Sequence, residues 1–337
     1  MEVDLSGTPK LAGGSPPPQV AYDADIIILT ISRVYETIAA VRSACRQTGL
    51  GAHGLGVHVT VLDQGSPEAE FQILAAALQS ETGVSLYRGL TNLGVAGGRN
   101  FLAQQGNGKI IVGLDNDAVF ADDHMVAQTT RRFADHPRLG AIGFQIRSGD
   151  GACLDLSSWG YPQSLKPQRH GWFLTTTFVG AGHAIRRTAW QQAGGYDAKL
   201  FFTWEEYDFC RRAIKSGWQV GYDGSLVVWH KAASAERVGW QEARLGLFVR
   251  NRLVIARKWR EPLFLLIAGY LLKGLLAGRF IATLEGIMAG LQWQLVSTQA
   301  MPPSMLAYLQ QHEVDHRGAW WQRVQFELFR KRPAASG

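Results

Sequence analysis

The 337-residue sequence contains only three cysteines, and their arrangement does not resemble a structural site. Cys45, Cys153 and Cys210 are odd in number and lack the paired spacing of zinc ligands, which argues against a disulfide framework or a cysteine zinc site. The first residues also lack the basic and apolar segments of a secretory signal peptide. We therefore expect a protein of a reducing compartment, the cytoplasm.

The sequence also lacks an apolar run long enough to cross a bilayer. The run at 263–272 ends at Lys273, with Arg279 close behind, whereas a membrane-spanning helix needs about 20 apolar residues. Residues 1–22 include a Gly/Pro-rich stretch at 13–18 and are expected to be disordered. The remainder has enough apolar residues for a globular core of one large domain or two modest ones.

Charge is distributed unevenly along the chain. Lys and Arg minus Asp and Glu gives 21 − 22 = −1 for residues 1–238 and 13 − 6 = +7 for residues 239–337. The basic excess of the C-terminal third predicts an anionic partner for that region. We accordingly expect a catalytic domain at 23–238, followed by a basic, mainly helical region at 239–337.

Short apolar runs alternate with helical patterns in the first half of the chain. Strands are expected at 25–30, 57–62, 84–87 and 110–114, and the intervening segments have helical periodicity. This order predicts an α/β fold: a doubly wound, mostly parallel sheet with helices on both faces. In such sheets, ligands bind at the carboxyl ends of the strands.

Acidic residues and a histidine follow several of these strands. Asp115, Asn116 and Asp117 come directly after one strand and Asp63 ends another. Two carboxylates at i and i+2 can converge on one hard cation, although a turn or a local cap after a strand is the alternative. His230 ends a later strand, where it is either a ligand of a metal or diphosphate or a structural residue.

A glycine-rich segment, residues 92–100, precedes the acidic motif. Its spacing differs from G-x-G-x-x-G and it follows the third strand, which argues against a dehydrogenase. Its glycines would let the backbone approach a phosphate or sugar, and Arg99 would pair with an anion near the start of a helix. A flexible loop with a solvated arginine is the alternative.

A second acidic cluster follows Trp204 at residues 205–208. Thr203 and Glu206 have the spacing of a capping box, which is the structural interpretation. The functional interpretation is a general base at the start of a helix, beside aromatic residues. Because Glu206 cannot serve fully in both roles, we expect an imperfect cap if it is the base.

In their order along residues 24–235, these segments resemble family 2 glycosyltransferases with the GT-A fold. The N-L-G-x-A-G-G-x-N form of residues 92–100 is most similar to the rhamnosyltransferase-like members. The other matching features are Asp63, the D-x-D at 115–117, Gly180 and Gly182, the G-G-Y-D at 194–197, the acidic segment 205–210 and His230.

The resemblance implies an inverting, metal-dependent glycosyltransferase. It would move a sugar from a nucleotide-sugar donor to a hydroxyl of a glycan or lipid-linked acceptor, in cell-surface polysaccharide assembly. Mg²⁺ or Mn²⁺ would be held by Asp117, His230 and Asp115. Glu206 is the implied base, and Glu205 is the alternative because the family has aspartate where this chain has Glu206.

The same resemblance implies further contacts. The implied donor-binding residues are Thr30, Arg33, Asp63, Asn92, Gly94, Gly98, Arg99, Asp115 and Asn116. The implied acceptor or sugar-binding residues are Gly180, Gly182, Trp204 and Asp208. A non-catalytic nucleotide-sugar or carbohydrate-binding module on the same fold, or a nucleotidyltransferase, is the alternative function.

Basic and aromatic residues are concentrated in the C-terminal region. An anionic membrane attracts each nearby basic residue by about 1 kcal/mol, and tryptophan suits the headgroup zone. We therefore predict peripheral attachment to the inner face of the cell membrane and no nucleic-acid partner; a helical cap on the catalytic domain or on a dimer partner is the alternative. The residues concerned are Arg250, Arg252, Arg257, Lys258, Arg260, Trp259, Trp293, Trp320 and Trp321.

Overall fold

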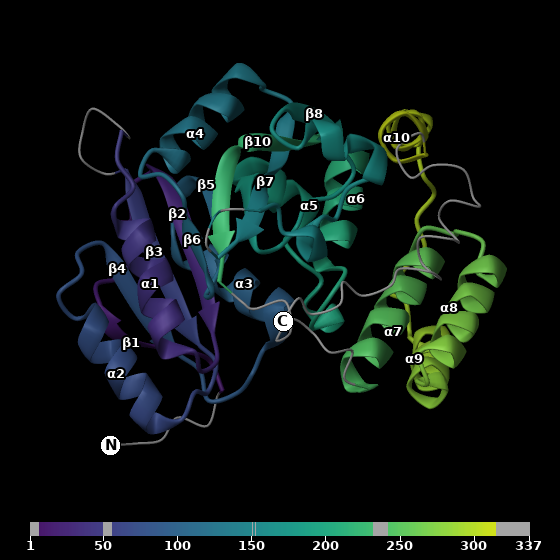
Figure 1. Ribbon diagram of the computed structural model, residues 1–337, viewed down its shortest axis with the longest axis horizontal. Helices are drawn as coiled ribbons and strands as arrows, with labels where there is room; N and C mark the ends of the chain where they lie inside the picture. The colour runs from purple at the N-terminus through teal and green to yellow at the C-terminus, as the bar shows by residue number, and fades with distance from the viewer. Residues whose placement is uncertain (1–6, 50–55, 150, 152, 232–241, 315–337) are drawn as a thin grey trace.

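A computed structural model describes residues 7–49, 56–149, 151, 153–231 and 242–314 (Figure 1). The strands are β1 (Lys10–Gly14), β2 (Tyr22–Thr30), β3 (Val57–Asp63), β4 (Val84–Arg88), β5 (Gly108–Asp115), β6 (Ala118–Phe120), β7 (Leu139–Ser148), β8 (Trp172–Thr175), β9 (Gly182–Arg186) and β10 (Gln219–His230). The helices are α1 (Val34–Cys45), α2 (Glu68–Leu78), α3 (Gly94–Gln105), α4 (Met125–Asp135), α5 (Arg187–Ala193), α6 (Glu205–Lys215), α7 (Glu242–Lys258), α8 (Phe264–Leu276), α9 (Phe280–Gln292) and α10 (Pro303–Leu309).

The strands form one sheet in the order β1-β4-β3-β2-β5-β9-β7-β10-β6, and β8 pairs with β10. Strands β2, β3, β4, β5, β7 and β10 run in one direction, whereas β1, β6, β8 and β9 run against them. The predicted mostly parallel α/β sheet is therefore confirmed. Antiparallel β9 separates the two parallel groups.

Helices cover both faces of the sheet, as expected. Helices α1, α2 and α4 share one buried apolar cluster with alternate residues of β2 and β3. Helices α3, α5 and α6 bury the opposite face, where α7 and α10 also pack. Because both faces are covered, the central strands are buried almost throughout, which explains their continuous apolar runs.

The parallel strands bring distant polar residues to one edge of the sheet. In the register of the strands, Thr30 lies opposite Asp63, and its neighbour Leu29 lies opposite Asp115. His230, the last residue of β10, lies opposite Ala118 of β6. This edge is therefore where the polar groups predicted from the strand ends assemble.

The N-terminal segment differs from the expectation. Residues 10–14 form β1, which pairs antiparallel with β4, so the prediction that residues 1–22 are disordered is wrong for this stretch. The pairing uses main-chain hydrogen bonds, which do not depend on apolar side chains. Gly14 has φ +70°, and an added Cβ would collide with the Val84 carbonyl group, so the glycine permits this close edge. Residues 1–6 lie outside the described residues.

The C-terminal region is helical, as predicted, and within the described residues no helix is both long and apolar enough to cross a membrane. The five basic side chains between residues 250 and 260 are bound within the chain, which the membrane prediction did not anticipate. Their acceptors are the Leu200 carbonyl for Arg250, Glu261 for Arg252, the Gly290 and Trp293 carbonyls for Arg257, Asp208 for Lys258, and Thr298 for Arg260. The contacts of Arg250 with Leu200 and of Lys258 with Asp208 join this region to the catalytic domain, which favours the interpretation of a packed helical cap.

The tryptophans of this region are similarly constrained. Trp259 is buried, so it does not reach a headgroup zone. The Trp293 ring stacks under the Arg250 guanidinium at 4.9 Å. Trp320 and Trp321 lie outside the described residues.

Candidate active site

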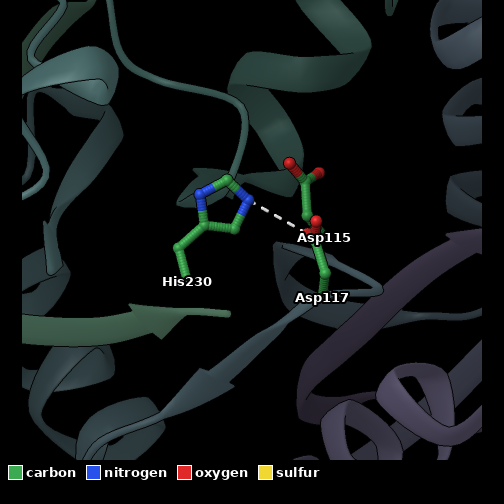
Figure 2. Close-up of side chains that lie close together, drawn as sticks. All are labelled: Asp115, Asp117 and His230. Atoms are coloured by element: carbon green, nitrogen blue, oxygen red, sulfur yellow. Dashed lines mark hydrogen bonds and ion pairs between the residues drawn. The ribbon is translucent and has the colours of Figure 1, made fainter. Parts of the chain in front are cut away.

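Three side chains converge at the carboxyl edge of the sheet. Asp115 ends β5, Asp117 lies in the turn before β6, and His230 ends β10. One ligand atom of each lies within 4.8 Å of the others, and Figure 2 shows the side chains gathered with His230 directed at Asp117. Two carboxylate oxygens and an imidazole nitrogen are a donor set suited to Mg²⁺ or Mn²⁺. The residues predicted as metal ligands therefore meet.

We call Asp115, Asp117 and His230 the metal cluster. Positively charged neighbours compensate the charge of Asp117 within it. Nε2 of His230 lies 3.0 Å from Oδ1 of Asp117, and Nη1 of Arg33 lies 2.8 Å from Oδ2 of the same carboxylate. Burial alone would lower the pKa of His230, but the bond to Asp117 raises it. Burial would raise the pKa of Asp117, and the His230 bond together with Arg33 lowers it. Asp117 is therefore held as a carboxylate.

Asp155 adjoins this cluster and was not predicted. Its Oδ2 lies 3.5 Å from Nδ1 of His230, on the ring edge opposite Asp117. Ser158 donates to the same oxygen at 2.5 Å. A carboxylate behind a metal-binding histidine fixes the orientation of its ring. Asp155 lies in an aperiodic loop, so no spacing in the sequence connects it to His230.

Asn116, the middle residue of the acidic motif, is bound to the interior. Its Nδ2 donates to Oγ1 of Thr30 at 3.1 Å and to Oγ1 of Thr37 at 3.2 Å. The two threonine hydroxyls lie 2.8 Å apart. These bonds fix the turn that carries Asp115 and Asp117 to β2 and α1. Thr37 was not predicted.

Asp63 is fully buried. Its carboxylate accepts from the backbone N–H of Ser66 at 3.3 Å and from the Ser66 hydroxyl, and Arg88 lies 3.7 Å away. The Ser66 hydroxyl in turn accepts from the Ser32 N–H at 2.7 Å. Asp63 thus shapes the loops beside the site, and its contact with a nucleoside stays a prediction.

The glycine-rich segment is packed against the protein itself. Gly94 has φ +72°, and an added Cβ would collide with Phe201. An added Cβ on Gly98 would lie 2.7 Å from Leu29. The Asn92 side chain accepts from the Gly94 N–H at 2.8 Å, and the Val95 N–H donates to the Phe201 carbonyl at 2.7 Å. These glycines therefore let the segment pack closely on Phe201 and Leu29, and their contact with a donor stays a prediction.

Arg99 connects the metal cluster to the second acidic cluster. Its guanidinium donates to Asp115 at 2.8 Å, to the Gly180 carbonyl at 2.8 Å and to Oε1 of Glu206 at 3.1 Å. Burial would lower the pKa of Arg99, but these carboxylates raise it. Arg99 is thus a buried cation between two acidic groups, and the alternative of a solvated arginine is wrong.

Helix α6 presents the two glutamates differently. The Glu206 side chain is 16% exposed, whereas Glu205 is 3% exposed. Oε2 of Glu205 has no hydrogen-bond partner among the described residues. Burial raises the pKa of both groups, and the charge of Glu206 raises the pKa of Glu205 further. Glu206 is therefore the more exposed of the two carboxyl groups, and burial and the neighbouring charge hold the pKa of Glu205 well above its usual range.

The capping box expected at this helix does not form. Trp204 is the N-cap residue, and the helix start has no side-chain cap bond. The buried Thr203 hydroxyl lacks a partner within the described part of the chain. Glu206 is bound to Arg99 instead, so the cap is imperfect in the way expected of a functional glutamate.

Gly180 and Gly182 also make room for the protein's own groups. An added Cβ on Gly180 would collide with the Glu206 carboxylate, so this glycine allows Glu206 to approach Arg99. An added Cβ on Gly182 would lie 2.7 Å from Val228. Their contact with an acceptor sugar stays a prediction.

Trp204 and Asp208 make polar contacts with α7, and Asp208 also binds Arg212 of α6. The Trp204 indole N–H donates to the Phe248 carbonyl at 3.0 Å. The buried Asp208 carboxylate binds Arg212 and Lys258, each at 2.8 Å. Both polar groups thus have partners inside the protein, and their role in acceptor binding stays a prediction.

Asn251 of α7 holds the loop that leads to Glu206. The loop contains three non-glycine residues with left-handed backbone, Phe201, Thr203 and Trp204, at φ 66°, 70° and 71°. Such residues cost about 1–3 kcal/mol each and persist where the surroundings fix them. The fully buried Asn251 amide donates to the carbonyl oxygens of Leu200, Phe202 and Thr203 at 2.9, 2.9 and 3.0 Å. The C-terminal helices therefore position the second acidic cluster.

Similar solved structures establish the fold. Mannosyltransferase PcManGT from Pyrobaculum calidifontis, in complex with GDP-Man and Mn²⁺, gives a TM-score of 0.58 at 16% identity, covering 94% of this chain and 87% of that one. GalNAc-T7 with UDP, GalNAc and Mn²⁺ gives 0.56 at 13% identity, covering 76% of this chain. The match covers 51% of GalNAc-T7, so the chain spans about half the length of that protein.

Sequence comparison identifies the family. An uncharacterized protein of Haemophilus influenzae is 30% identical over 177 residues, which cover 50% of this chain and 90% of that protein. The pattern of the family described as Glycosyl transferase family 2 matches residues 25–193, which are 169 of the 337 residues. The chain therefore belongs to glycosyl transferase family 2, and it is a glycosyltransferase with the GT-A fold.

Proposed function

We propose that this glycosyltransferase is metal-dependent and inverting. The observation that carries the proposal is the meeting of Asp115, Asp117 and His230 within 4.8 Å, with Glu206 joined to the same cluster through Arg99. The structural neighbours in complex with Mn²⁺ and with UDP or GDP-Man support a nucleotide-sugar donor here too.

The residues divide the chemistry between them. Asp115, Asp117 and His230 hold the cation and thereby the donor diphosphate beside it. When bound, Mg²⁺ or Mn²⁺ supplies positive charge against the negative charge that develops on the leaving nucleoside diphosphate. Arg99 supports the cluster by fixing the Asp115 carboxylate from the protein side.

Glu206 is the proposed general base. It takes the proton of the acceptor hydroxyl while the acceptor oxygen bonds to the anomeric carbon and the bond to the diphosphate breaks. A displacement in one step inverts the configuration of that carbon. Positioned proton transfer of this kind contributes about 10²- to 10⁴-fold in rate. Glu206 suits the role because its side chain is partly exposed, whereas Glu205 is buried.

The proposed acceptor is a glycan or a lipid-linked glycan in cell-surface polysaccharide assembly. The proposed location is the cytoplasm, with peripheral attachment to the inner face of the cell membrane. Three free cysteines among the described residues are in keeping with a reducing compartment. Mg²⁺ and Mn²⁺ both fit the oxygen-rich donor set.

The test begins with a panel of nucleotide sugars screened for thermal stabilisation of the protein with Mg²⁺ or Mn²⁺. The stabilising donor is then incubated with glycan acceptors, and nucleoside diphosphate release and the anomeric configuration of the product are measured. Metal-dependent release with inversion is expected. Binding without donor consumption would indicate a binding module, pyrophosphate release a nucleotidyltransferase, and a retained configuration would contradict the single displacement.

A further inference from the structure

The outer face of the α8–α9 hairpin, residues 264–292, is apolar and exposed. Every exposed position of α8 is apolar: Phe264, Leu265, Ala268, Gly269, Leu272, Leu275 and Leu276. On α9 the large exposed residues are Phe280, Ile281, Leu284, Met288 and Leu291. Glu285 is the one charged residue on the exposed side of α9, a helix described in full. Contiguous apolar patches of this kind mark interaction surfaces.

These outward residues are not needed to hold the hairpin together. The inward side of α8 packs through Tyr270 and Gly274, and an added Cβ on Gly274 would lie 2.7 Å from Cβ of Thr283 on α9. On α9, Ile287 joins the apolar cluster that includes Val249 of α7. The three helices therefore complete their own core and leave a second apolar face unused.

We propose that this face lies on an anionic lipid monolayer. The inference rests on the proposed peripheral location, and it places the contact on this apolar face because the five basic side chains between residues 250 and 260 are bound internally. The two helices have 13 residues each, about 20 Å, so they suit a position within the interface plane. Figure 1 shows α7 between the catalytic domain and α8, so α8 lies on the far side of α7 from the sheet.

Charge distinguishes a lipid surface from a second copy of the chain. Lys273 lies in the last turn of α8 and Arg279 is the N-cap residue of α9, while α8 itself carries no acidic residue. Residues 239–337 have an excess of 13 − 6 = +7. Pairing this region with its own copy would bring two such regions together, whereas anionic headgroups complement the charge.

Helix α7 connects the proposed lipid contact to the active site. Helix α7 packs against α9 through Val249, and its Asn251 binds the loop before Glu206. A lipid surface at α8 and α9 therefore lies one helix away from the loop that presents the proposed base. Such an arrangement suits an acceptor that is held at the membrane.

The test is flotation of the full chain with vesicles of phosphatidylglycerol and phosphatidylcholine. Leu275 and Ile281 are 64% and 73% exposed, so the double substitution Leu275→Glu with Ile281→Glu adds charge to the face without entering the core. We expect it to reduce the vesicle-bound fraction by ~10-fold or more. Ile73→Glu on α2, at a residue 42% exposed, is the matched control and should float like the unmodified chain.

Several outcomes would overturn the inference. An unmodified chain that never floats, a double variant that floats unchanged, or binding that high salt alone abolishes would each exclude an apolar lipid contact. A dimer in sedimentation that the same double variant dissociates would assign the face to a second copy. Circular dichroism checks that the variants are folded. Flotation without sugar transfer would instead count against the proposed catalysis and leave the docking surface standing.

Discussion

The carboxyl edge of the sheet is built from paired charges, whereas the α8–α9 face is built from exposed apolar side chains. At the edge, Asp117 has both His230 and Arg33 as partners, and Arg99 binds both Asp115 and Glu206. On the helical face, large apolar side chains are exposed although the helices are already packed behind them. A network of paired charges fixes one geometry, as a reaction requires. An apolar face tolerates variation in its contacts, as a surface for lipid requires.

Helix α7 lies between the two regions and serves both. Its apolar side packs against α9 through Val249, and its Asn251 and Phe248 bind the loop that leads into α6. The positive φ angles of that loop are maintained by a residue that comes almost fifty positions later in the chain. The C-terminal helices therefore hold the loop that precedes the proposed base.

The largest expected effect is the loss of sugar transfer when the proposed base, Glu206, is replaced. Glu206→Gln keeps the size of the side chain and removes its basicity, so sugar transfer should fall by about 10²- to 10⁴-fold while donor affinity is retained. Product release and calorimetric donor binding are the measurements. Glu205→Gln should cost much less activity, because the Glu205 side chain is buried and burial raises its pKa. The reverse order would transfer the role to Glu205.

Removing one partner at the metal cluster is the next test. Asp117→Asn keeps a polar side chain but removes the charge shared with His230 and Arg33. Mn²⁺ affinity should fall by more than ~10- to 100-fold, which is the loss typical when a residue that only hydrogen-bonds to a metal ligand is replaced. Isothermal titration with Mn²⁺ and a nucleoside diphosphate measures it. Asp123→Asn, at an exposed acid on the same chain, is the control and should bind Mn²⁺ normally.

Asn251→Ala removes the hydrogen bonds by which α7 holds the loop before Glu206. Three carbonyl groups would lose their donor, so the free energy of unfolding should fall by about 1–3 kcal/mol. The turnover number should fall with it, because the loop before Glu206 relaxes. Thr283→Ala removes a buried hydrogen bond on α9 and should lower stability while leaving turnover intact. Equal turnover in both variants would show that Asn251 stabilises the fold only.

The smallest expected effect concerns the pH dependence of stability. The pKa of Glu205 is raised well above its ordinary value of 4.5, so between these two values the folded state binds more protons than the unfolded state. The free energy of unfolding should therefore decrease as pH rises through this window, by at most about 1.4 kcal/mol per pH unit. Denaturant titrations at several pH values should find this slope in the unmodified chain and a shallower one in Glu205→Gln. A slope unchanged by the substitution would show that Glu205 is ionised in the folded protein.

Much of the fold could be predicted from the sequence because its signals are local. Continuous apolar runs identify β2, β3 and β5, since both faces of the sheet are covered. The acids of the metal cluster and His230 follow from their position at strand ends. The order of these motifs along the chain then identifies the family, which no single motif does.

The remainder depends on contacts between distant parts of the chain. Arg99 is near a helix start, which suggests an anionic ligand, but its partners Asp115 and Glu206 are 16 and 107 residues away. Asp155 and Asn251 lie in segments without a motif, so only the packed structure connects them to His230 and to the loop before Glu206. Strand β1 forms through main-chain pairing at an edge, which apolar patterning does not report.

The central claim is that Asp115, Asp117 and His230 hold one cation together with the donor diphosphate. Anomalous diffraction from crystals grown with Mn²⁺ and the stabilising nucleoside diphosphate tests it most directly. The account predicts one strong peak within coordinating distance of all three side chains and of the diphosphate oxygens. A diphosphate bound without such a peak, or a peak at another part of the chain under conditions that support turnover, would contradict it.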